Sequence, residues 1–111
     1  MGILVLAYCT ASDVRLLVHT SLSDSDIESL IAFADAELDS MLGGASMSTT
    51  QKKNCSMRLT AVMIVASQPR REKVGDLVFE YADRIMEWRR YVRRQVARAV
   101  GRWHVVDALE D

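Results

Sequence analysis

Seven arginines lie close together in the last long segment of the chain, and their side chains are the ones best suited to bind something. They fall between residues 84 and 102, where Glu87 is the only acid. Helical spacing would align Arg90, Arg94 and Arg98 in one row, and like charges at that spacing repel unless something negative lies opposite. Guanidinium groups match carboxylate and phosphate in fork geometry. The pattern therefore indicates a solvated face, or a face that binds acidic protein surface or a nucleic-acid backbone. The candidate interface residues of this segment are Arg89, Arg90, Arg93, Arg94, Arg98 and Arg102.

The first half of the chain carries the opposite charge. Residues 1–51 hold seven acids and a single base, Arg15, which gives a net charge of −6, whereas residues 52–111 sum to +5. We expect a helix from about residue 24, and the acids in its first turns suit the positive N-terminal end of the helix dipole. The later ones, Asp35, Glu37 and Asp39, lie too far along it for that role. We expect these three to be solvated or to face a basic neighbour, and they complete the candidate interface.

No residue pattern indicates catalysis, a cofactor or a metal site. Cys9 and Cys55 have no ligand or catalytic partner at motif spacing, so we expect buried structural thiols. We expect His19 near the end of a first helix, where the dipole favours it, and His104 in the C-terminal tail. No glycine-rich phosphate loop is present. No apolar run reaches the length of about 18 residues that a membrane span needs.

Capping signals and apolar spacing predict an all-α fold, a small bundle of about four helices. Thr10 is an expected N-cap for a first helix over about residues 11–19. Ser23, with Asp26 three residues later, should begin an acidic helix whose apolar residues recur at steps of three and four. The pair Gly43–Gly44 should end that helix.

Two further helices follow. Ser48 with Gln51 predicts the start of a third helix over about residues 49–67, which is central because residues 59–66 are apolar except for Thr60. The last helix runs to about residue 102 with Trp88 on its apolar side. It can begin after Asp76 or at Asp83, and we favour the later start.

The chain is expected to form one domain over residues 1–111. It consists of an extended apolar N-terminal arm (1–9), a helical core (10–103) and a short tail (104–111). The arm has no basic region and no cleavage site of the kind that marks a signal peptide. Its hydrophobicity is unusual for a free terminus, so we expect it to pack on something.

Several short segments, in this order, resemble the head–tail connector proteins of tailed phages, also called head-completion or adaptor proteins. The resemblance covers roughly residues 8–95. It rests on Tyr8-Cys9-Thr10-x-x-Asp13-Val14-Arg15, on Leu22-Ser23-Asp24-x-Asp26-Ile27-x-x-Leu30-Ile31, on Ala34-x-x-x-Leu38-Asp39, and on Lys73-Val74-Gly75-Asp76 followed by Tyr81. The chain departs from the family in its long apolar run at residues 3–7 and in Leu-Val-Phe at residues 77–79, where the family is more polar.

The resemblance implies a virion structural protein of a phage or prophage, without enzymatic activity. Such a protein assembles as a homo-oligomeric ring, dodecameric in the virion, beneath the portal protein of the viral head. The ring extends the DNA channel, lets double-stranded DNA pass without specific contacts, and provides the docking platform for a downstream tail-completion protein. The expected location is the virion head–tail junction, and the host cytoplasm before assembly.

The alternative is a small helical nucleic-acid-binding protein, a DNA packaging or regulatory factor that uses the arginine-rich helix on phosphates. A ring needs heterologous contacts, in which one surface meets a different surface of the next copy. An acidic first half and a basic last helix are suited to that. No recognised DNA-binding motif is present to read bases.

Overall fold

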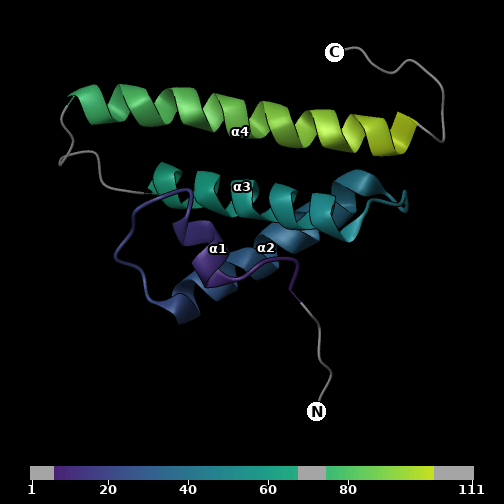
Figure 1. Ribbon diagram of the computed structural model, residues 1–111, viewed down its shortest axis with the longest axis horizontal. Coiled ribbons are helices and arrows are strands. Elements are labelled where there is room, and N and C mark those ends of the chain that lie inside the picture. Colours follow the sequence, from purple (N-terminus) through teal and green to yellow (C-terminus); the bar gives the residue numbers. More distant parts are fainter. Residues whose placement is uncertain (1–6, 68–74, 102–111) are drawn as a thin grey trace.

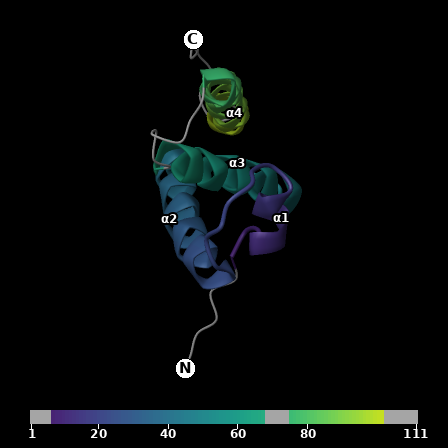
Figure 2. The ribbon, with the colours of Figure 1, turned by 90° about the vertical axis from the view of Figure 1, so that its left-hand side faces the viewer.

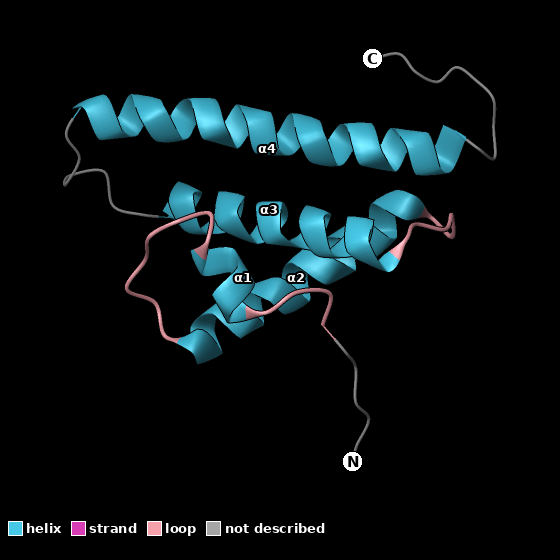
Figure 3. Ribbon diagram, viewed as in Figure 1, coloured by secondary structure: helices cyan, strands magenta, loops and turns pink. Residues whose placement is uncertain are grey.

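The computed structural model describes residues 7–67 and 75–101, with side chains placed for 7–67 and 83–101. This part of the chain holds four α-helices and no strand (Figure 3), which confirms the all-α fold. They are α1 (Ala11–Arg15), α2 (Asp24–Leu42), α3 (Thr49–Ser67) and α4 (Gly75–Gly101). The first six residues of the expected arm and the tail, with Arg102 and His104, lie outside the described residues.

Helix α3 lies in the middle of the molecule, as its sequence predicts. Helix α4 runs along one side of α3, and α1 and α2 lie on the other side (Figures 1 and 2). Eight of the residues of α3 are buried, among them the polar Ser56 and Thr60. A helix that is apolar on most of its circumference needs covering on several sides, and these two layers cover it.

Helices α2 and α3 form an antiparallel hairpin whose ends are set by the predicted caps. The Ser23 side chain accepts a hydrogen bond from the backbone N–H of Asp26 (3.1 Å) at the start of α2. Gly43 ends α2 in the left-handed conformation, with φ of 56°, which glycine adopts without steric cost. The Ser48 side chain then accepts from the Gln51 N–H (3.1 Å) at the start of α3.

Helix α1 is shorter than expected. Its predicted N-cap, Thr10, is confirmed and forms a capping box, because Thr10 and Asp13 exchange side-chain-to-backbone hydrogen bonds, but the helix ends at Arg15. The Arg15 guanidinium donates to the carbonyls of Thr20 (3.4 Å) and Leu22 (2.8 Å) and so fixes the chain that leads to α2. His19 therefore lies beyond the helix, and its expected role at a helix end is wrong.

Helix α4 begins earlier than expected. It starts at Gly75 and is continuous over 27 residues, so the preference for a start at Asp83 is wrong and residues 77–81 are helical. The sequence holds the reason, since Val78, Tyr81 and Ile85 extend the apolar row of Trp88 at steps of three and four. Residues 77–81 thus continue the apolar spacing of the rest of the helix.

The core consists of two clusters along α3. One joins α1 and the first half of α2 to Ile64 and to Trp88 of α4, and the other joins Leu38 of α2 to Cys55 and to Val92 of α4. Trp88 is only 7% exposed, which confirms its predicted place in the core. Both thiols are buried and unbridged, as expected.

Thr60 gives a direct test of how α3 is packed. Its side chain is fully buried, and its hydroxyl makes no hydrogen bond with the described residues. Thr60→Val keeps the shape and removes an unsatisfied polar atom, so we expect the free energy of unfolding to rise by about 1 kcal/mol.

Urea unfolding followed by circular dichroism measures the change. The matched control is Thr50→Val on the exposed first turn of the same helix. We expect it to stay within about 0.5 kcal/mol of wild type. A Thr60→Val protein less stable than wild type would contradict the assignment of an unsatisfied hydroxyl.

Candidate assembly surface

Five arginines form an exposed face on the second half of helix α4. All five side chains are exposed, and none makes a hydrogen bond or ion pair with another described residue. They are Arg89, Arg90, Arg93, Arg94 and Arg98. We call this set the arginine face. Because its charges repel one another along the helix, it favours any acidic group that comes from outside the described chain.

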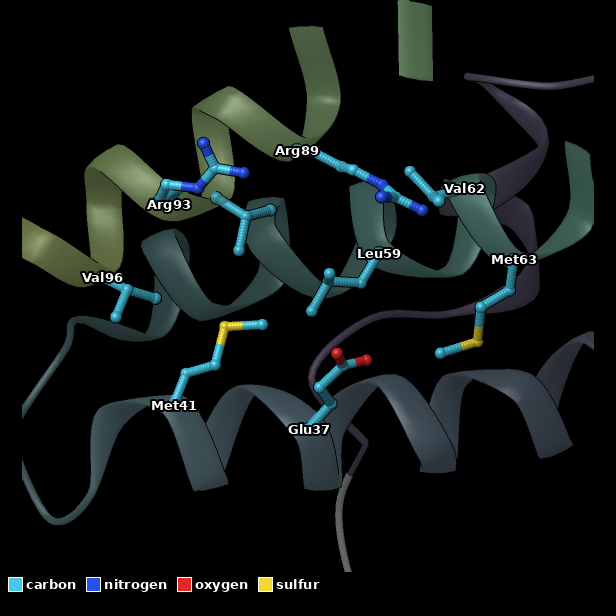
Figure 4. Close-up of a pocket in the computed structure, with 9 residues that line it drawn as sticks. Glu37, Met41, Leu59, Val62, Met63, Arg89, Arg93 and Val96 are labelled. Atoms are coloured by element: carbon cyan, nitrogen blue, oxygen red, sulfur yellow. The ribbon is translucent and has the colours of Figure 1, made fainter. Parts of the chain in front are cut away.

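Part of this face borders a groove that crosses three helices (Figure 4). The cavity has a volume of about 550 Å³. Helix α3 provides its floor with Leu59, Val62 and Met63. The sides come from α2, which contributes Glu37 and Met41, and from α4, which contributes Arg89, Val92, Arg93 and Val96. The groove therefore has an apolar floor between walls that carry opposite charges.

Exposed apolar side chains extend the groove at one end. Phe33 is 67% exposed and lies one turn before Glu37 on α2, and Met86 is 58% exposed and lies one turn before Arg89 on α4. Helical spacing therefore places each of them on the groove side of its helix. Sequence reasoning missed this strip. It considered only the apolar residues of α2 that recur at steps of three and four from Ile27, and Phe33 is not one of them.

The chain ahead of α1 is fixed to the other side of α2. The backbone N–H of Tyr8 donates to Asp35 Oδ2 (3.0 Å), and the Tyr8 hydroxyl donates to Asp39 Oδ1 (2.6 Å). Asp35 and Asp39 lie nearly opposite Glu37 and Met41 around α2, since successive residues turn by 100°. The described chain thus enters the molecule on the side away from the groove.

A buried hydrogen-bond chain reinforces this attachment. The Ser56 hydroxyl donates to Asp35 Oδ1 (2.6 Å), and Cys9 Sγ lies 3.3 Å from Ser56 Oγ. Burial raises the pKa of the Cys9 thiol to about 11. It also raises the pKa of the Cys55 thiol to about 11. Both thiols are therefore held in the unreactive neutral form at physiological pH.

The three bases of α3 are used within the molecule. The Lys52 ammonium lies over the Tyr8 ring at 5.1 Å, and the Lys53 ammonium lies 3.7 Å from Asp13. The Arg58 guanidinium stacks on the Tyr91 ring, 4.2 Å from its centre. These contacts hold the N-terminal segment and α4 on α3, and they leave the arginine face as the main uncompensated positive region among the described residues.

The structure brings together some of the predicted interface residues and separates others. Glu37 lines the groove with Arg89 and Arg93. Asp35 and Asp39 accept the hydrogen bonds of Tyr8 and Ser56 described above. Asp39 is also exposed to solvent, whereas Asp35 is half-buried. Arg102 lies outside the described residues. Sequence reasoning missed Tyr8 as their partner, since no local pattern relates residues about 30 positions apart.

Among the described residues, no group of three or more His, Cys, Asp or Glu side chains is arranged to hold a metal ion. No helix in the described ranges is both long and apolar enough to cross a membrane.

Comparisons with protein-family models, with curated proteins and with solved structures found no match.

The Tyr8–Asp39 contact predicts a late step in alkaline titration. The hydrogen bond to Asp39 is the main cause that raises the pKa of Tyr8 to about 12, from 10.0. The folded state therefore favours the neutral phenol. The stability that this gives is complete below pH 10 and is lost as the pH rises toward 12.

Tyrosinate absorbance measures the step, and Tyr8→Phe should remove it. The same substitution should lower the free energy of unfolding at neutral pH by about 1 kcal/mol, because Asp39 loses its donor. Tyr91→Phe is the matched control, since it removes a phenol and leaves the Tyr8 contact in place. A late step that persists in Tyr8→Phe would show that another tyrosine causes it.

Proposed function

We propose that this chain is a head–tail connector of a tailed phage or prophage, which acts by assembly and not by catalysis. In this role copies form a ring beneath the portal protein, extend the DNA channel and offer a docking platform to the next tail component. The segments that resemble the connector family support the proposal. So does the all-α fold, in which the capping residues of those segments form the starts of α1 and α2.

The observation that carries the proposal is the arginine face of α4. Helix α2 contains six acids and no base, whereas the arginine face contains five bases within ten residues. Helix α3 keeps most of these charges apart within one molecule (Figure 2). Two separated surfaces of opposite charge are suited to head-to-tail contact between copies, which closes into a ring when the rotation between copies allows it.

The same face supports the second candidate, binding to a nucleic-acid backbone. Arg90, Arg94 and Arg98 form an exposed row at helical spacing, as sequence analysis expected. Such a row can contact phosphates without reading bases, and the affinity of such contacts falls steeply with salt. In a connector, phosphate contacts that do not read bases would let DNA slide through the channel.

Negative-stain electron microscopy of the purified full chain over a concentration series tests the connector. We expect closed rings with a central hole. The triple variant Arg90→Ala, Arg94→Ala, Arg98→Ala should assemble at least tenfold less tightly, because the face loses its charge.

The matched control replaces the same three residues with lysine. Lysine keeps the charge and loses the fork geometry, so carboxylate pairing between copies should weaken while diffuse attraction to DNA remains.

Duplex DNA titrated at several salt concentrations separates the candidates. Sub-micromolar affinity at physiological salt, together with no rings, would contradict the connector and favour the nucleic-acid-binding protein.

A further inference from the structure

We propose that the groove between α2 and α4 binds the apolar segment Ile3–Leu6 of a second copy of this chain. The proposal rests on the connector function, because it names the contact by which copies would join. It also assigns an occupant to a surface that the charges alone do not explain.

The chemistry of the groove fits an apolar chain segment. Its floor of Leu59, Val62 and Met63 is apolar, and Met41 borders it at 38% exposure. Figure 4 shows the side chains of Met41 and Met63 reaching from different helices into the same space. Methionine side chains adapt to irregular apolar partners. The exposed Phe33 and Met86 lengthen this strip beyond the cavity itself.

The longest run of large aliphatic residues in the sequence matches this chemistry. Residues 3–6 are Ile-Leu-Val-Leu, four consecutive large aliphatic residues. They directly precede Ala7 and Tyr8, which belong to the described chain. A contact between the two would cover the exposed apolar side chains of the groove and the four aliphatic side chains of the segment at once.

The geometry favours a second copy over the same molecule. Tyr8 is held on Asp35 and Asp39, nearly opposite the groove around α2. Leu6 is two residues from Tyr8 and so lies about 7 Å from it at most, whereas a helix with its side chains is about 10 Å thick. A segment that leaves on one side of α2 and a groove that opens on the other give a head-to-tail contact. Contacts of that kind propagate and can close into a ring.

The charges at the groove would align this contact. Glu37 lies on one wall, and Arg89 and Arg93 lie on the other. An extended segment carries free backbone N–H and C=O groups along both edges. A carboxylate can accept from the N–H groups while guanidinium groups donate to the carbonyls. The walls would therefore fix the direction of the segment, and the floor would take up its side chains.

Mixing two defective variants tests the proposal in the full chain. Leu4→Asp with Leu6→Asp disables the segment, and Met41→Asp disables the groove. Each variant alone should self-associate at least tenfold more weakly than wild type by sedimentation or native mass spectrometry. Their mixture should form pairs with one copy of each and grow no further, because only one working contact remains.

Leu16→Asp is the matched control. Leu16 is 79% exposed, lies outside the groove lining and receives the same apolar-to-acid change, so it should associate like wild type. Circular dichroism and urea midpoints check that each variant folds. Phe33→Asp provides a second groove variant should Met41→Asp unfold. Segment variants that assemble like wild type, a wild-type chain that never associates, or a mixture that forms no pairs would each overturn the proposal.

A photo-reactive residue at position 4 identifies the occupant. With isotope-labelled and unlabelled chains mixed, we expect a cross-link between residue 4 of one copy and the groove of another. A cross-link within one copy would overturn the proposal. Rings that survive the segment variants would refute this contact and leave the connector function intact. One-to-one pairs in a protein that never forms rings would support the contact and refute the connector.

Discussion

Helix α3 must be covered on almost all sides, and the rest of the structure depends on this requirement. Cys55, Ser56 and Ala61 point in three directions about 100° or more apart, and all three are fully buried. Burial on this scale needs neighbours on opposite faces, so α1 and α2 take one face and α4 takes the other. One consequence is electrostatic. The acidic helix and the arginine face end up in different layers and cannot neutralise each other except along the groove.

The attachment of Tyr8 shows how the polar groups follow from that packing. Asp35 accepts hydrogen bonds from the Tyr8 backbone and from Ser56 of α3, so one carboxylate joins three parts of the chain. A half-buried carboxylate needs such donors, since desolvation without them is costly. The same bonds fix where the chain enters the molecule. They thereby set the side of α2 on which the described chain begins.

These arrangements make the two sides of α2 structurally different. One side holds the N-terminal segment through Asp35 and Asp39. The other side carries Phe33, Glu37 and Met41 and borders the groove. A molecule with a donor on one side and a receptor on the other can form chains or rings of identical contacts. The proposed connector role and the proposed docking of a second copy both use this asymmetry.

The sequence by itself determined the local elements, because their signals are short in range. The caps at Thr10, Ser23 and Ser48, the stop at Gly43 and the burial of Trp88 were predicted correctly. The end of α1 and the start of α4 were not predicted correctly. Arg15 bonds backbone carbonyls beyond α1, which no capping pattern indicates, and Asp83 offered a competing start for α4 although the apolar steps already reach back to Val78. Only the tertiary structure decided that Asp35 and Asp39 bind Tyr8 and that Glu37 meets Arg89 across a groove. Periodicity assigns a residue to a face of its helix, but packing alone decides which faces meet.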